Sequence, residues 1–220
     1  MILRGKFEKR AAMKYIGHLD LMRTMQRAIR RADLPIAYSQ GYNPQQKMNF
    51  AMALALGLES EAEYFEVELA EDMKPADFVE RMNAALPEGI RILRADRIEN
   101  APKSLMSIVA WAKYAVQYPE EGKPEDAEAR TEAFLKEKEI WTTRRRKKKK
   151  QIVSKQVEIR QWIDTLVWEG DTMKMVLKTG SNGNLKPEEV LPILFPERTM
   201  PDIRRLEIYR DTKKGRKPLL

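Results

Sequence analysis

Cysteine is absent from this 220-residue chain, and histidine occurs only once. The lack of cysteine excludes disulfides, thiolate catalysis and cysteine-ligated zinc or iron–sulfur clusters within the chain. A single histidine also argues against a metal site built from imidazoles. We therefore expect no metal or cofactor bound to this chain.

Long apolar runs are also missing. No stretch approaches the roughly 18 consecutive apolar residues of a membrane-spanning helix, and the first ten residues lack the apolar core of a signal peptide. The expected compartment is the cytoplasm, with no membrane partner. Charged residues instead make up 34% of the chain, a share that predicts a heavily charged surface.

The net charge of +8 is unevenly distributed along the chain. Residues 1–100 contain 15 basic and 15 acidic residues, whereas residues 101–220 contain 26 basic and 18 acidic residues. The whole excess of positive charge therefore lies in the second half. Such an asymmetry favours an anionic partner, most often a nucleic acid.

The hydrophobic pattern predicts the same order of elements in both halves of the chain. Alternating apolar and polar residues indicate strands, and apolar residues spaced three and four apart indicate helices. In the first half, strands are expected at residues 3–9, 35–39, 47–56, 64–69 and 90–98, and helices at 19–33 and 74–86. In the second half, strands are expected at 108–118, 139–143, 151–163, 166–179 and 204–211, and helices at 125–138 and 186–194.

Two halves of the βαββαβ type predict an α+β fold. We expect two tandem ferredoxin-like domains with antiparallel sheets, spanning residues 1–100 and 101–220. Asn100 and Pro102 mark the boundary between them. The last six residues, GRKPLL, are expected to fray.

The first predicted helix carries arginines opposite its apolar face. Their spacing of i, i+4, i+7 and i+8 forms one basic stripe, and a guanidinium can donate two parallel hydrogen bonds to a phosphate. This stripe predicts a contact for an RNA backbone or for a partner's acidic face. An ordinary solvated helix face, cationic toward its C-terminus, is the alternative. The residues are Arg23, Arg27, Arg30 and Arg31.

His18 and Asp20 follow Gly17 at the start of this helix. A carboxylate in the first turn is stabilised by free amides and by the helix dipole, which gives Asp20 a structural role. His18 could act as a general base, because an imidazole changes charge near neutral pH. No nucleophile or metal cluster accompanies it, so we expect no catalytic residue and keep His18 with Asp20 as the one candidate pair.

A polar turn follows the helix, from Ser39 to Lys47. Gly41 can supply a positive φ, and Asn43-Pro44 marks a turn. Tyr42 is predicted to stack on a base and Lys47 to contact a phosphate. The alternative is a tight hairpin in which the tyrosine packs on the core.

Seven consecutive cations form the strongest charge feature of the sequence, with Trp141 before them and Trp162 after them. Mutual repulsion makes burial of such a run costly, so we expect an exposed loop or hairpin tip. Short basic runs bind phosphate backbones through release of counterions, although such a run can also be a solvated, disordered loop. The predicted nucleic-acid contacts are Arg144, Arg145, Arg146, Lys147, Lys148, Lys149 and Lys150.

Several short motifs in residues 15–70 resemble those of one bacterial family. Together they are similar to the radical SAM-linked domain, a family of unknown function found beside, or fused to, radical S-adenosylmethionine proteins. Gln45-Gln46 stands where the family usually has His-Pro, a departure that argues against acid–base chemistry at this turn. The matching motifs are Gly17-His18-Leu19-Asp20, Arg30-Arg31-Ala32, Leu34-Pro35, Ser39 to Pro44 with Lys47, and Glu59-Ser60 with Glu63.

The resemblance implies a partner rather than an activity. Radical SAM chemistry needs cysteines for its cluster, so S-adenosylmethionine and the iron–sulfur cluster are expected in a separate protein. Tandem ferredoxin-like folds with basic surfaces are common RNA binders. We therefore expect a non-catalytic RNA-binding accessory protein that works with a radical SAM enzyme in tRNA or rRNA modification or processing.

Two other functions fit the same residues. The protein could be a metal-independent endoribonuclease with His18 as the base, similar to CRISPR repeat-processing enzymes that combine ferredoxin-like domains with a histidine. It could also be an adaptor that binds only protein, with the arginine stripe docked on an acidic partner.

Overall fold

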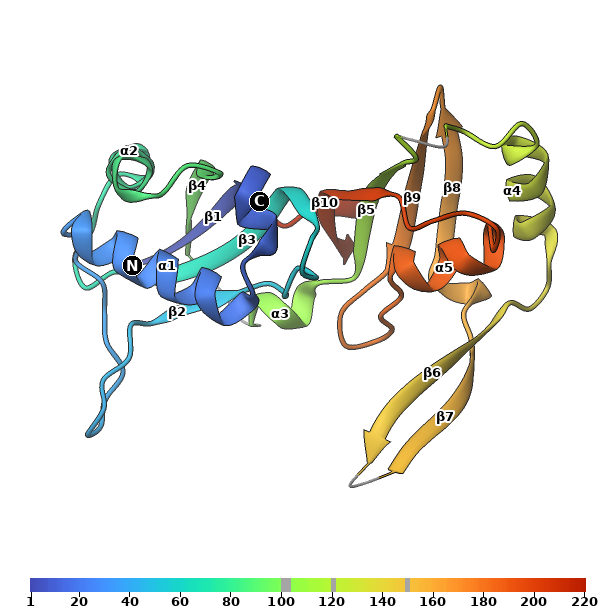
Figure 1. Cartoon of the computed structure of the whole chain (residues 1–220). Helices are drawn as coiled ribbons and strands as arrows, with labels where there is room; N and C mark the ends of the chain where they lie inside the picture. Colours follow the sequence, from blue (N-terminus) through green and yellow to red (C-terminus); the bar gives the residue numbers. More distant parts are fainter. Residues whose placement is uncertain (100–103, 120–121, 149–150) are drawn as a thin grey trace. The chain divides into compact units, whose positions relative to one another are not determined.

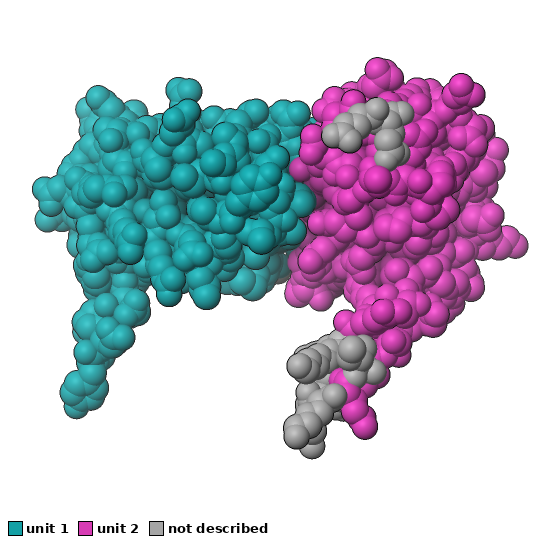
Figure 2. All heavy atoms as spheres, viewed as in Figure 1, with its two compact units in different colours: residues 1–110, 204–220 teal, residues 111–203 magenta. Residues whose placement is uncertain are grey.

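The computed structural model describes residues 1–99, 104–119, 122–148 and 151–220. The chain forms two compact units, unit 1 with residues 1–110 and 204–220 and unit 2 with residues 111–203 (Figure 2). Both units mix helices with mostly antiparallel strands, as the α+β prediction required. The units divide the chain differently from the predicted domains of 1–100 and 101–220, because the last strands belong with the first unit.

In unit 1, β1 pairs antiparallel with both β3 and β4 (Figure 1). The short β2 pairs with the second half of β3, and β10 runs parallel to the first residues of β3. In chain order the elements are β1 (Ile2–Lys9), η1 (Ala11–Tyr15), α1 (His18–Arg31), β2 (Met48–Phe50), β3 (Glu59–Glu68), α2 (Pro75–Ala85), β4 (Ile90–Ile98), α3 (Leu105–Ile108), β10 (Asp202–Thr212) and β11 (Gly215–Pro218).

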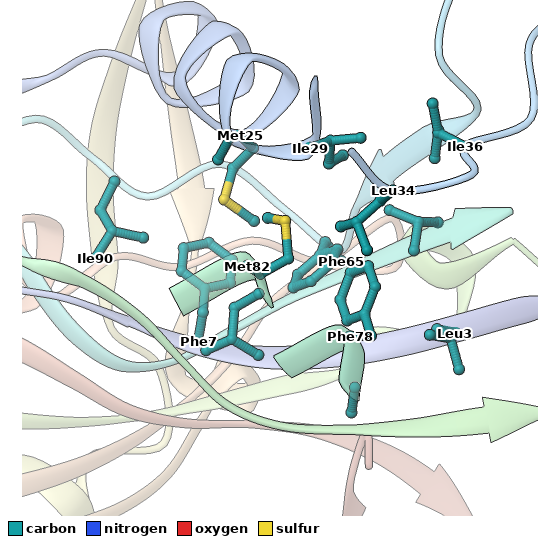
Figure 3. Packing of buried hydrophobic residues seen from close by; sticks show 14 of the residues in the cluster. Leu3, Phe7, Met25, Ile29, Leu34, Ile36, Phe65, Phe78, Met82 and Ile90 are labelled. Carbon is teal, nitrogen blue, oxygen red and sulfur yellow. The ribbon is translucent and has the colours of Figure 1, made fainter. Parts of the chain in front are cut away.

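The core of unit 1 lies between the sheet and helices α1 and α2 (Figure 3). Met25 and Ile29, one turn apart on α1, are fully buried, as the apolar spacing of this helix predicts. Phe78 and Met82 repeat this spacing on α2, and Phe65 of β3 packs near Phe78. The opposite side of α1 is thereby left for polar residues.

Two predicted strands of unit 1 are much reduced. Residues 35–39 form only isolated bridges, at Ile36 and Tyr38, and the strand expected at 47–56 shrinks to β2. The physical reason is that the chain between α1 and β2 leaves the sheet to form a polar loop. The strand expected from residue 108 begins later, because α3 occupies residues 105–108.

The predicted fraying of the last residues is wrong. Residues 215–218 form β11 against β10, and Leu219 is only 1% exposed. Arg4, itself buried, donates from Nη1 to the carbonyl oxygen of Leu219 at 2.6 Å and pairs with Glu66 at 2.7 Å. The C-terminal residues are therefore held in place by burial of the Leu219 side chain and by the charged donor Arg4.

A second buried ion pair joins β10 to β3. Arg205 and Glu63 lie 2.8 Å apart, and each side chain is only 3% exposed. Lys9 is buried beside them, donating to the carbonyl oxygen of Ile16 at 3.1 Å. Burial lowers the pKa of Lys9, because a charged ammonium is poorly solvated there. Residues 204–220 are therefore an integral part of unit 1.

In unit 2, β9 pairs antiparallel with β5 on one side and β8 on the other. Gly170 has a positive φ in the tight turn between β8 and β9, which divides the stretch expected as a strand at 166–179. A separate two-stranded sheet, β6 with β7, extends from this unit (Figure 1). The elements are β5 (Trp111–Gln117), α4 (Ala127–Lys136), β6 (Trp141–Lys148), β7 (Gln151–Glu158), η2 (Arg160–Trp162), β8 (Ile163–Glu169), β9 (Thr172–Lys178) and α5 (Pro187–Leu194).

None of the helices in the described ranges is both long enough and apolar enough to cross a bilayer.

Candidate nucleic-acid interface

The four arginines of the α1 stripe do not share one environment. Arg23 pairs with Asp20 at 3.2 Å, and Arg31 donates to the carbonyl oxygen of Ala85 at 2.6 Å. Arg27 and Arg30 are exposed, and neither forms an ion pair with a described residue. These two guanidiniums are therefore the free cations of the stripe.

His18 and Asp20 lie close in sequence but are not coupled. His18 packs edge-on against the Phe50 ring at 5.5 Å, and no described residue forms a hydrogen bond with its imidazole. The Asp20 carboxylate is engaged with Arg23 instead. His18 and Asp20 therefore do not form a hydrogen-bonded Asp–His pair in this structure. The endoribonuclease hypothesis stays a prediction.

The segment between α1 and β2 forms a braced loop, residues 37–47. The backbone N–H of Lys47 donates to the carbonyl oxygen of Ala37 at 2.9 Å, which closes its base. Ser39 accepts from Gln45 N–H through Oγ at 2.9 Å and donates its own N–H to Gln45 at 2.8 Å. Gly41, with φ of 119°, occupies a conformation that L side chains rarely adopt.

Residues 40–45, at the outer part of the 37–47 loop, are exposed to solvent. Tyr42 is fully exposed at the tip and does not pack on the core. The carbonyl oxygen of Asn43 accepts a hydrogen bond from Gln45 Nε2 at 3.4 Å, and Pro44 follows. Lys47 is paired with Glu68 at 2.9 Å, so its charge is partly neutralised. The loop therefore exposes an aromatic ring for contact with a partner, whereas its lysine is already paired.

A small hollow lies between α1 and the 37–47 loop. Its volume is about 140 Å³. Gln46 Oε1, on the loop side, is buried without a hydrogen-bond partner. The hollow is lined by Gln26, Arg30, Tyr38, Pro44, Gln45 and Gln46.

The basic run lies largely in one strand of an antiparallel pair, which corrects the expected loop but not the alternative of a hairpin. Arg144 to Lys148 belong to β6 and pair in register with residues 151–155 of β7. Alternation along a strand places successive side chains on opposite faces, so Arg144 and Arg145 point to different sides of the pair of strands. Lys149 and Lys150 lie outside the described residues. We call the β6–β7 sheet, residues 141–158, the arm.

Arg144 anchors the arm to the body of unit 2. Its guanidinium donates to Glu189 Oε1 at 2.6 Å and to the carbonyl oxygen of Asn184 at 2.5 Å. It also lies 5.1 Å from the centre of the Trp162 ring, a cation–π distance. With its donors occupied in this way, Arg144 serves the fold of the arm rather than an external phosphate.

Arg145 lies on the other face of the arm and is exposed, with no ion pair to any described residue. Trp141 shares this face, because it lies four residues before Arg145 on the same strand. The Trp141 ring is 52% exposed, and its Nε1 donates to Glu139 at 3.1 Å. Ser154 is the cross-strand partner of Arg145. This face combines an aromatic ring, a free cation and small polar groups.

The base of the arm is closed by the Glu158 carboxylate. It accepts hydrogen bonds from the backbone N–H groups of Ile140 and Arg160 and from the side chain of Gln161. Burial alone would raise the pKa of Glu158, yet these hydrogen bonds hold it below its usual range. The arm is therefore fixed at its base on both strands.

A metal site is not evident in the part of the chain that the structure describes. No group of three histidine, cysteine, aspartate or glutamate side chains there is arranged to hold an ion. Cysteine is absent from the whole sequence.

Comparison with known families places the chain in a bacterial group. Residues 3–187 match the family described as an uncharacterized protein conserved in bacteria (DUF2344). The chain belongs to this family. The match runs from β1 to the first residue of α5, so it includes residues of both units. No curated protein matches the chain. The family description does not mention radical SAM enzymes, so that link stays a prediction.

Several residues of these surfaces were not foreseen from the sequence. Tyr38 and Gln46 were placed in a strand or passed over, and only the folded loop brings them to Arg30. Glu189 and Trp162 were not expected to hold Arg144. A glutamate in the first turn of the predicted helix at 186–194 was the one local signal for such a partner.

Proposed function

We propose that this protein is an RNA-binding accessory subunit that works with a radical SAM enzyme in tRNA or rRNA modification or processing. The observation that supports RNA binding best is the arm. It displays Arg145 and Trp141 on one exposed face while Arg144 fixes the other face to unit 2. A free guanidinium binds phosphate, and an exposed aromatic ring stacks on an unpaired base.

Unit 1 provides a second surface of the same chemistry. Arg27 and Arg30 are free cations on α1, and Tyr42 stands exposed at the loop tip. Single-stranded RNA is recognised by such a combination of cations and aromatic platforms.

The radical SAM partner rests on the sequence resemblance around His18, Ser39 and Glu59. A protein without cysteine cannot hold the cluster, so the cluster and S-adenosylmethionine belong to the partner. The role left for this chain is to bind and present the RNA.

We further propose that each unit is built on the βαββαβ plan. In unit 1, the chain order β1-α1-β2-β3-α2-β4 and the pairing β4-β1-β3-β2 fit that plan. In unit 2, β5, α4, β8, β9 and α5 fit its first five elements. The arm is then an insertion between α4 and β8.

The test is RNA affinity as a function of salt concentration, measured by fluorescence anisotropy with a labelled single-stranded RNA. The logarithm of the binding constant should fall linearly with the logarithm of salt, with a slope of about −0.7 for each phosphate contacted. Arg145→Glu should weaken binding and make the slope shallower by about one such contact.

Lys136→Glu makes the same change in net charge at an exposed position of α4, where Lys136 pairs with Glu132. The RNA affinity of Lys136→Glu and the slope of its salt dependence should stay close to those of the wild type. Binding that does not respond to salt, or an equal loss in both variants, would exclude the arm as the RNA contact.

A further inference from the structure

The hollow beside α1 has features that phosphate contacts alone do not explain. It is lined on one side by Gln26 and Arg30, one turn apart on the helix, and on the other by the 37–47 loop. Arg27, on the same stripe, does not line it. Phosphate binding would need only free cations, whereas this hollow is lined mainly by amides and an aromatic ring.

The size of the hollow restricts what it can hold. A protein cavity of about 150 Å³ accommodates one benzene-sized ring. The hollow, at about 140 Å³, therefore has room for a single six-membered ring. A two-ring purine would extend beyond this volume, which is well below the roughly 300 Å³ of pockets for larger ligands.

An unsatisfied acceptor gives the hollow a chemical preference. Gln46 Oε1 is buried and has no hydrogen-bond partner. A buried acceptor without a donor is costly, so a ligand that brings a donor gains from it. The amide is held only by Nε2, which donates to the carbonyl oxygen of Gln26 at 3.5 Å, the outer limit for a hydrogen bond. Because Nε2 has this partner within the protein and Oε1 has none, the side chain has an acceptor rather than a donor left for a ligand.

Two neighbours complete a site for a base and its phosphate. Tyr38 faces Gln46 across an antiparallel bridge, which places both side chains on the same side of the loop. The Tyr38 ring is 45% exposed and offers a stacking face. Arg30 lies free at the rim, within the same lining, to bind the phosphate.

We propose that this hollow binds the base of an unpaired cytidine. Cytosine is a single six-membered ring with an exocyclic amino group, which can donate to Gln46 Oε1. Uracil carries a carbonyl oxygen at that position, so two acceptors would face each other without a proton between them. This inference rests on the proposed function and adds a base preference to it.

The experiment compares labelled single strands of ten cytidines, ten uridines and ten adenosines against the intact protein by fluorescence anisotropy. The cytidine strand should bind about tenfold more tightly than the uridine strand, the usual scale for one base-specific hydrogen-bond contact. The ratio of the two affinities should not change with salt concentration, because a base contact releases no counterions.

Variants connect the preference to the hollow. Gln46→Leu should bring the ratio close to one, whereas Gln40→Leu, on the same loop but outside the lining, should preserve it. Arg30→Ala should weaken the binding of both the cytidine and the uridine RNA more than Arg27→Ala does. Circular dichroism checks that each variant is folded.

Equal binding of cytidine and uridine strands by the wild type would overturn the cytidine site and leave RNA binding intact. Tighter binding of the adenosine strand, or a preference that survives Gln46→Leu, would also overturn it. If no strand binds at all, the proposed function fails together with the site.

Discussion

The hydroxyl of Tyr64 couples the stability of unit 1 to alkaline pH. The side chain is 1% exposed, and its hydroxyl donates to Glu207 Oε1 at 2.5 Å. The other oxygen of Glu207 pairs with Lys6 at 2.7 Å. Burial and then the hydrogen bond to Glu207 raise the pKa of Tyr64 above its ordinary value. The folded state therefore keeps a proton that the unfolded chain loses above about pH 10.

The pKa of Tyr64 is higher in the folded protein than in the unfolded chain. The stabilisation that its hydroxyl provides is therefore complete below the pKa of the unfolded chain and is lost as pH increases. Above about pH 10, the free energy of unfolding should fall by up to about 1.4 kcal/mol per pH unit on account of this group. The stability difference between wild type and Tyr64→Phe, from urea denaturation between about pH 8 and 11, should shrink. Tyr42→Phe at the exposed loop tip is the control. A difference that stays constant would contradict the assignment.

Single-residue roles show where sequence reasoning ends. The alternation around Tyr64 predicted a strand, yet nothing local indicates Glu207, which lies 143 positions away. Arg144 and Arg145 look identical within the basic run, and only their faces on the arm separate an anchor from a free cation. Gln46 was noted in the sequence only as a departure from the family's motif, because its place in the hollow depends on the loop that surrounds it.

At the scale of elements, the arm depends on Arg144. Arg144→Ala would leave the Glu189 carboxylate without its charged donor and would remove the contact with Trp162. Because these side chains are partly exposed, we expect a loss of about 1 kcal/mol in the free energy of unfolding. Arg145→Ala should change stability by less than about 0.5 kcal/mol. Thermal unfolding of the two variants makes the comparison, and equal melting temperatures would mean that the anchor contributes nothing.

Elements with strong periodicity were predicted well, and those set by tertiary contacts were not. The α1 face of Met25 and Ile29 was predicted, as were strands in the regions of β1, β3 and β4. The tail strand β11 was missed because its order comes from Arg4 and from burial of Leu219, both distant in sequence. The strand within the basic run was missed because the repulsion between seven consecutive cations favoured an irregular segment.

At the scale of the whole molecule, unit 1 is built from two distant stretches of chain. A fragment of residues 1–110 would leave Glu63 without Arg205 and Arg4 without the carbonyl oxygen of Leu219. Breaking a buried ion pair costs about 3–5 kcal/mol, so we expect this fragment to be unfolded or far less stable than the complete unit.

The matched comparison is residues 1–110 joined to residues 204–220 through a short flexible linker. Its thermal unfolding should be cooperative, and at a higher temperature than that of the shorter fragment. Similar melting curves for the two would show that residues 204–220 are dispensable.

Because unit 1 consists of two distant stretches of chain, the ribosome synthesises its two parts at different times. Glu63 is made 142 residues before Arg205. At a translation rate of about 5–20 residues per second, the Glu63 carboxylate is without its arginine partner for about 7–28 s. Until β10 emerges, the edge of β3 that it will cover is open to other strands in the cell. The first unit to begin leaving the ribosome is therefore the last to be completed, and its nascent form is the stage at which this protein most needs protection from aggregation.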